Sequence, residues 1–336
     1  MTNIIISTTC NMRCAYCFAE DHMQTAIGDH AQTFITLDTF EARLDALDRS
    51  GIDEIRLIGG EPTLHPQFPA LIERARRRGK HLVVFTHGLI SERALAVLEA
   101  IPVDACTILV NTNASRHIDG PTPDEQARRR AVLLRLGARA LPGFTIDTPG
   151  AALDFLLSLA LETGCQPKIR LGLAQPILSG RNRYLHPKQY PLVGQPIARF
   201  AQAAAQYGIT VELDCGFVRC MFSETELEML HAAGVETAWR CSPILDVGID
   251  GTIMHCFSLG SRVVLRPTDS ATATDLRAAL ADQVRPYRAA GIYKACSSCS
   301  FKLTGACTGG CLSATLQRFR ASPAPRLVVP EEVLGI

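Results

Sequence analysis

The sequence predicts an α/β protein in which repeated βα units surround a parallel sheet and a smaller cysteine-rich module follows. From residue 3 to about 213, short β-branched runs alternate with amphipathic stretches, as in βα units. Beyond about residue 214 the expected elements become short, and eight cysteines lie between Cys215 and Cys311. We therefore expect a first domain over 1–213, a cysteine-rich domain over 214–316 and a Pro-rich, loosely docked tail over 317–336.

Six strands are expected from runs that are mostly apolar enough to be buried on both faces of a parallel sheet. They are 3–7, 54–58, 81–86, 106–111, 139–146 and 168–174, and a candidate seventh is 210–213. The stretch 20–33 is expected to be a loop.

Two helices carry signals of their own. The first has Thr36 as a plausible N-cap, and its apolar face is formed by Phe40, Leu44 and Leu47. The second has Gly79 where a C-terminal cap belongs, and its apolar stripe is formed by Phe68, Leu71, Ile72 and Ala75.

Composition argues against several function classes. Of 336 residues, 47% are hydrophobic, and no unbroken apolar run approaches 18 residues, so no membrane partner is expected. Lysine and arginine total 34 against 33 acidic residues, a balance that disfavours nucleic acid as a partner. The N-terminus has no charged signal segment, which indicates a cytoplasmic protein. Its 13 cysteines would then be reduced, and their grouping favours metal binding or catalysis over disulfides.

The first cysteine group directly follows the first expected strand. Cys10, Cys14 and Cys17 are separated by three and then two residues. Three thiolates in one loop can hold three irons of a 4Fe-4S cubane and leave the fourth iron open to a chelating ligand. The alternatives are a zinc site or chance clustering, but zinc usually takes four protein ligands in structural sites, and no fourth Cys or His lies close.

Two motifs at the ends of successive strands resemble those of the radical S-adenosylmethionine (SAM) enzymes. The first is CNMRCAYC, with Tyr16 before the last cysteine, and the second is the GGEP element formed by Gly59, Gly60, Glu61 and Pro62. The resemblance covers roughly residues 1–213 and implies a partial (β/α)6 TIM-like barrel. It also implies a 4Fe-4S cluster on the three cysteines, with the GGEP element contacting the ammonium group of S-adenosyl-L-methionine. An external one-electron reductant would start the cleavage of this cofactor to a 5'-deoxyadenosyl radical, which abstracts a substrate hydrogen atom.

Further cofactor contacts are expected at strand ends, where barrel enzymes place their chemistry. Asn111 and Asn113 are candidates for the ribose or the methionine carboxylate, or they simply form the turn after the fourth strand. His87 stands where relatives often have Asn, and it either contacts substrate or caps the third strand.

The second cysteine group resembles the SPASM extension, which holds one or two auxiliary 4Fe-4S clusters. By resemblance, Cys241, Cys256 and Cys311 share the barrel-proximal cluster, and Cys296, Cys299 and Cys307 hold the distal one. This chain departs from the pattern in one spacing, and no cysteine follows Cys311.

Two further cysteines could supply the ligands that this departure leaves missing. Cys215 and Cys220 bring the total to eight, enough for two clusters, in an order that the sequence leaves open. One cluster with an open iron is the rival, and a zinc knuckle formed by Cys296, Cys299, Cys307 and Cys311 is another alternative. Cys106 and Cys165 are expected to be core residues, and His255 to lie behind the ligands or at the surface.

Auxiliary clusters near a substrate radical suit net oxidation, so we expect an oxidoreductase. The leading hypothesis is a peptide maturase that cross-links or dehydrogenates a ribosomally made peptide. Only nine residues precede Cys10, so a separate protein would have to bind a leader peptide. The alternative is dehydrogenation or epimerisation of a small molecule such as a sugar or aminocyclitol. A non-catalytic iron-sulfur or zinc protein is a third, which the GGEP element argues against.

Overall fold

A computed structural model describes residues 2–25, 32–113, 122–178, 182–266 and 271–320. Seven parallel strands follow one another in chain order: β1 (Asn3–Ser7), β2 (Glu54–Gly59), β3 (His81–Thr86), β4 (Cys106–Asn111), β5 (Ala140–Ile146), β6 (Lys168–Leu173) and β7 (Thr210–Leu213). The expected strands are present with ends shifted by a residue or so, including the candidate seventh. The sheet order is linear, with β7 at one end, so these strands form a partial barrel.

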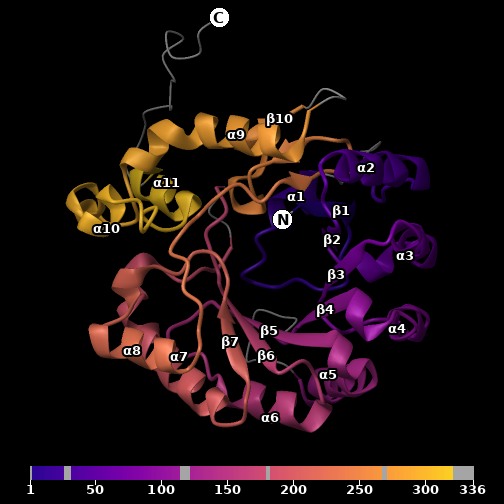
Figure 1. Ribbon diagram of the computed structural model, residues 1–336, viewed down its shortest axis with the longest axis horizontal. Coiled ribbons are helices and arrows are strands. Elements are labelled where there is room, and N and C mark those ends of the chain that lie inside the picture. Colours follow the sequence, from indigo (N-terminus) through magenta and orange to yellow (C-terminus); the bar gives the residue numbers. More distant parts are fainter. Residues whose placement is uncertain (1, 26–31, 114–121, 179–181, 267–270, 321–336) are drawn as a thin grey trace, which may run out of the picture.

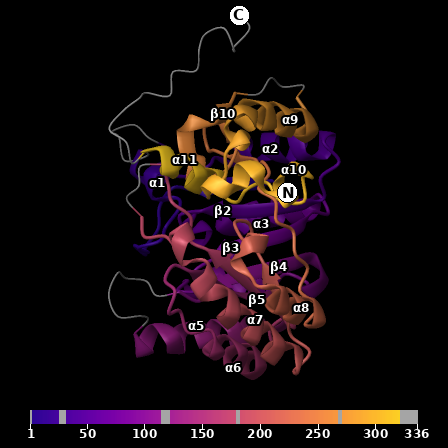
Figure 2. The same ribbon diagram turned by 90° about the vertical axis from the view of Figure 1, so that its left-hand side faces the viewer.

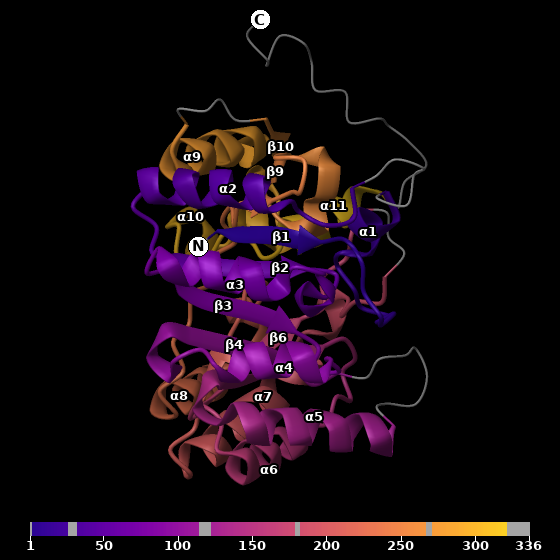
Figure 3. The same ribbon diagram turned by 90° about the vertical axis from the view of Figure 1, so that its right-hand side faces the viewer.

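Helices cover the outer face of this sheet (Figures 1 and 3). They are α2 (Leu37–Arg49), α3 (Phe68–Arg77), α4 (Glu92–Glu99), α5 (Pro123–Leu136), α6 (Asp154–Thr163) and α7 (Pro191–Ala205). Thr36 caps α2, because its hydroxyl accepts a hydrogen bond from the Thr39 amide, and Gly79 follows α3 with a φ of +67°. The apolar faces expected for these two helices are buried. None of the helices in the described ranges is long and apolar enough to cross a membrane.

The expectation of a loop over 20–33 was wrong at its start. Residues Glu20–Thr25 form the short helix α1, and its first turn carries Glu20 and Asp21, which complement the positive end of a helix. Phe34 forms an isolated bridge with Ser7. Residues 26–31 lie outside the described ranges.

The C-terminal module extends the sheet at the β1 edge. β8 (Asp246–Val247) pairs in parallel with β1, and β9 (Ile253–Met254) and β10 (Val264–Leu265) continue antiparallel. The module's helices are α8 (Glu224–Ala232), α9 (Ala273–Val284), α10 (Ser300–Leu303) and α11 (Leu312–Arg320). α11 continues past residue 317, where the tail was expected, and residues 321–336 lie outside the described ranges.

The module lies across the open side of the partial barrel (Figures 1 and 2). Ile292, Cys296 and Cys311 of the module are buried in the same apolar cluster as Ile197 and Phe200 of α7. Burial of shared apolar surface favours a fixed arrangement of packed elements. The barrel and the module are therefore held together by a shared apolar core.

Candidate active site

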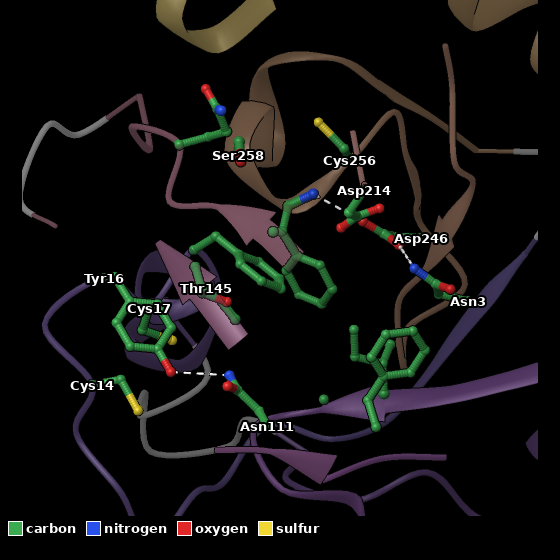
Figure 4. A pocket seen from close by; sticks show the side chains of 18 of the residues that line it. Asn3, Cys14, Tyr16, Cys17, Asn111, Thr145, Asp214, Asp246, Cys256 and Ser258 are labelled. Carbon is green, nitrogen blue, oxygen red and sulfur yellow. Dashed lines mark hydrogen bonds between the residues drawn. The ribbon is translucent and has the colours of Figure 1, made fainter. Parts of the chain in front are cut away.

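A cavity of about 580 Å³ lies between the barrel and the module (Figure 4). The cysteine loop after β1 lines one side through Cys10, Cys14 and Cys17. Four cysteines of the second group line the same cavity, namely Cys215, Cys241, Cys256 and Cys311. The structure thus brings both cysteine groups to one chamber although up to 301 positions separate them in the sequence.

The cysteine loop is fixed by its own backbone and by the segment after β6. The amide of Met12 donates to the Cys10 Sγ at 3.3 Å, and the amide of Arg183 donates to the carbonyl of Ala15 at 2.7 Å. Burial raises the pKa of Cys10 to about 11 and that of Cys17 to about 12. A thiolate here is therefore unfavourable without compensating positive charge, and an iron cluster supplies such charge.

The two glycines of the GGEP element lie against the cysteine loop. A Cβ on Gly59 would stand 2.1 Å from the carbonyl oxygen of Ser7, and one on Gly60 would stand 2.1 Å from that of Thr9. The amides of Gly60 and Glu61 donate to these same carbonyls. The close approach that requires glycine is therefore to the chain's own loop, and it sets where the cysteines stand relative to β2.

Glu61 is 1% exposed and its carboxylate ties three segments together. One oxygen accepts hydrogen bonds from the amide and hydroxyl of Thr63, which follows Pro62 at the start of a 3-10 turn. The other accepts from the Thr86 hydroxyl and the His87 amide. Glu61 also lines the cavity, so a bound ammonium group and these loops would share one carboxylate.

His87 connects the end of β3 to the cysteine loop. The Leu89 amide donates to its Nδ1 at 3.0 Å, so Nε2 carries the proton in the neutral ring, and this nitrogen lies 2.7 Å from the Asn11 Oδ1. Burial lowers the pKa of His87, which favours that neutral ring. The side chain therefore acts as a strand cap that also holds Asn11.

Asn111 and Asn113 both line the cavity and both have partners in the chain. The Asn111 amide donates to the Tyr16 hydroxyl at 3.0 Å (Figure 4). Asn113 exchanges two hydrogen bonds with the backbone of Thr145, at 2.8 and 2.7 Å. These bonds fit the turn interpretation, and the position on the cavity wall fits the ligand interpretation.

The structure divides the eight cysteines of the second group into two sets. Cys215 is accessible from the cavity. Desolvation by the surrounding protein and the carboxylate of Asp214 raise its pKa, and the thiols of Cys241, Cys311 and Cys256 raise it further. Burial raises the pKa of Cys220 to about 11, and its neighbouring thiols are those of Cys296, Cys307 and Cys299. We refer to Cys215, Cys241, Cys256 and Cys311 as the proximal set, and to Cys220, Cys296, Cys299 and Cys307 as the distal set.

This division bears on the zinc-knuckle alternative. Cys311 lines the cavity with the proximal set, whereas Cys296, Cys299 and Cys307 do not line it. Within the described ranges, no three Cys, His, Asp or Glu side chains are arranged to hold a single metal ion. A cubane instead takes one thiolate at each of four separate irons, so its ligands surround it rather than converge on one point.

The remaining sulfur and histidine positions lie as follows. Cys106 is 1% exposed within the barrel core, and neither it nor Cys165 lines the cavity. His255 is fully buried and lines the cavity, so the alternative prediction that it lies at the surface was wrong. It follows β9 directly, and its backbone amide donates to the carbonyl of Val263.

Several cavity residues carried no recognised motif. Asp246 of β8 is 1% exposed, accepts a 2.6 Å hydrogen bond from Asn3 of β1, and has its pKa raised to about 7 by burial (Figure 4). Arg170 of β6 forms an ion pair with Asp214 and lies 5.5 Å from the ring centre of Phe85. A charged residue between apolar neighbours in KIRLGL was a usable signal for Arg170, because buried parallel strands are usually apolar throughout. Asp246 gave no such signal, since its strand has two residues.

Comparison with known proteins identifies relatives of the barrel. Residues 4–156 match the sequence model of the Radical SAM superfamily. GTP 3',8-cyclase of Xanthomonas axonopodis pv. citri is 34% identical over 94 residues, which are 27% of this chain and 28% of that protein. An S-adenosylmethionine-dependent nucleotide dehydratase of Selenomonas ruminantium is 36% identical over 88 residues, 26% of this chain and 29% of that protein. The matches thus span less than a third of the length of these curated relatives.

Solved structures extend the likeness to almost the whole chain. Streptococcus suis SuiB bound to S-adenosylmethionine gives a TM-score of 0.69 at 14% identity, covering 96% of this chain and 74% of that one. anSMEcpe with bound AdoMet and the Kp18Cys peptide gives 0.66 at 14% identity, covering 95% and 94%. This shared fold confirms the partial barrel expected from the sequence. The match to the Radical SAM superfamily thus lies in residues 4–156 of the barrel, and that superfamily implies a 4Fe-4S cluster and S-adenosylmethionine.

Proposed function

We propose that this chain is a radical SAM oxidoreductase with a SPASM-like module and three 4Fe-4S clusters. The observation that supports it is the shared cavity, which has the cysteine loop on one wall and the proximal set on another. When bound, the loop cluster and S-adenosylmethionine supply a 5'-deoxyadenosyl radical that takes a hydrogen atom from substrate. A substrate in the cavity would then lie beside thiolate ligands suited to a second cluster, which favours oxidation.

The chain's own residues would fix the reacting groups. Cys10, Cys14 and Cys17 would hold three irons of the loop cluster and leave the fourth for the amino-acid portion of the cofactor. Gly60 lets β2 approach the loop, and Glu61 joins the loop to the end of β3. Holding these backbone segments in place before the ligand arrives reduces the entropy that binding must overcome.

The division of the second cysteine group supports two auxiliary clusters. Each set contains four thiols, the number that a fully ligated cubane takes. With four thiolates, neither cluster keeps an open iron for substrate. We therefore assign both clusters a role in electron transfer. The substrate radical left by hydrogen-atom abstraction would pass one electron to the neighbouring cluster and release one proton, so that the substrate loses two hydrogens in all.

A peptide is the favoured substrate. The two solved structures that share this fold over at least 95% of the chain, SuiB and anSMEcpe, have been obtained with the precursor peptide SuiA and the Kp18Cys peptide. The alternative, a small-molecule substrate, draws support from the names of the curated relatives, a GTP cyclase and a nucleotide dehydratase. A separate protein that binds a leader peptide would be needed only if the substrate is a peptide.

The test is iron content and cofactor cleavage in anaerobically loaded protein. We expect about twelve irons per chain and reductant-dependent formation of 5'-deoxyadenosine. Cys14→Ala should abolish cleavage and retain about eight irons. The core control Cys106→Ala should retain full cleavage and about twelve irons. Full cleavage by Cys14→Ala would refute the proposal. Adding either a peptide fraction or a small-molecule filtrate then separates the substrate classes, since only a substrate raises 5'-deoxyadenosine above the background and loses two hydrogens.

A further inference from the structure

A buried cation, Arg129, lies behind the cysteine loop. It belongs to α5 and is 3% exposed. Its Nε donates to the carbonyl of His87 at 2.9 Å, and its Nη2 lies 3.9 Å from the sulfur of Met12, which sits between Cys10 and Cys14. Its Nη1 is buried and has no hydrogen-bond partner among the described residues. One nitrogen of the guanidinium is thus left without a hydrogen-bond partner in the part of the chain that the structure describes.

Arg129 makes no direct ion pair. In the described part of α5, the ion pairs are made by Arg130 and Arg135, and none of them includes Arg129. Glu125, one turn earlier, favours the charged form of Arg129, and its carboxylate also accepts a hydrogen bond from the Thr122 amide at the start of the helix. A buried cation that no carboxylate contacts directly is further stabilised by an additional anion nearby.

The position of Arg129 indicates which anion this is. Arg129 is not among the residues that line the cavity, whereas Met12, which it contacts, is. Arg129 therefore stands behind the cysteine loop and touches it through Met12. A 4Fe-4S cluster on this loop brings three thiolate charges together, next to a guanidinium in a region of low dielectric.

Packing holds the side chain in this position. A Cβ on Gly88, which has a φ of +76°, would stand 3.3 Å from the Arg129 Cγ, so glycine leaves room for the arginine stem. The His87 carbonyl that receives the Nε bond belongs to the residue whose ring holds Asn11. The cation and the loop are thus fixed to the same strand end.

We propose that Arg129 is a positioning residue that stabilises the negative charge of the loop cluster and raises its reduction potential. This inference rests on the proposed function, because it requires a cluster on the loop. In the step concerned, one electron passes from an external one-electron reductant to the cluster, the reductant is oxidised, and no bond forms or breaks. Because the electron adds negative charge near a fixed cation, the reduced form gains more than the oxidised form.

The test compares variants that separate charge from hydrogen bonding. Arg129→Gln removes the charge but keeps an amide that can donate to the His87 carbonyl, and Arg129→Lys keeps the charge. Arg128→Gln, on an exposed position of the same helix, is the matched control. Each anaerobically loaded protein is assayed for iron and then titrated with dithionite. The electron paramagnetic resonance signal that changes on adding S-adenosylmethionine reports the loop cluster.

We expect the loop cluster of Arg129→Gln to titrate at a more negative potential than in the parent chain, with Arg129→Lys and the control close to the parent. The auxiliary signals should not move. Full iron with an unchanged potential in Arg129→Gln would overturn the proposal, and so would loss of the loop cluster from both Arg129 variants. Loss from Arg129→Gln alone would support it. A parent chain with no signal that responds to S-adenosylmethionine would instead refute the proposed function.

Discussion

Gly60→Ala tests whether the GGEP element positions the cysteine loop. The new Cβ would stand 2.1 Å from the Thr9 carbonyl oxygen and 2.4 Å from its carbon, whereas ordinary contacts begin near 3.4 Å. Both obstacles are backbone, so no side chain can rotate away, and the loop must move by more than about 1 Å. Such overpacking costs about 1–3 kcal/mol, and the amide bonds to Ser7 and Thr9 add about 0.5–1.5 kcal/mol each if they break.

Urea unfolding should therefore show a loss of about 2–6 kcal/mol for Gly60→Ala when both amide bonds break. Iron analysis of the same protein should show about eight irons in place of about twelve, because the displaced loop no longer presents its three thiols together. Gly150→Ala is the control, since nothing lies within 4 Å of its Cβ. If Gly60→Ala unfolds like the parent and keeps its full iron, the glycine is not there to seat the loop.

Three further outcomes follow from the same structure. The double variant Cys220→Ala, Cys299→Ala should lose about four irons per chain, no more than either single variant, because both cysteines belong to the distal set. The double variant Cys220→Ala, Cys256→Ala should lose about eight, because it removes one ligand from each set. Equal losses in the two double variants would refute the division into sets. Tyr16→Phe removes the hydroxyl that accepts from Asn111 and also interacts with Cys14. It should cost about 0.5–1.5 kcal/mol in urea unfolding for the lost bond to Asn111, with iron unchanged; a loss of iron would show that the hydroxyl also supports the cluster. Leu44→Ala, at a fully buried position of α2, should cost about 2–5 kcal/mol, and a cost below about 1 kcal/mol would contradict its place in the core.

The barrel could be predicted because its signals are local. Each strand is an apolar run that pairs with the next run in the chain, so strand order follows sequence order from β1 to β7. Thr36 and Gly79 mark the ends of helices through contacts within a few residues. The cysteine loop and the GGEP element could be located for the same reason, since each directly follows its own strand.

The module could be predicted only in part, because its contacts are between distant residues. β8 has two residues, too few to show a period, and its pairing with β1 is accompanied by a buried hydrogen bond between Asn3 and Asp246. The thiolate count raised the question of where Cys215 and Cys220 belong, but a count carries no distances. Only the packed chain brings Cys215 toward the cavity and Cys220 toward the distal set.

The same limit explains why Arg129 drew no attention in the sequence. It is the middle arginine of RRR in an amphipathic helix, and such a run is usually a solvated face. The helical period turns Arg128 and Arg130 outward and Arg129 inward, beside buried Val132 and Leu133. The sequence alone cannot show whether an arginine at this position is merely tolerated or is required. The buried Nη1 favours a required residue, because a surface arginine has water on every nitrogen, whereas this nitrogen has no partner among the described residues.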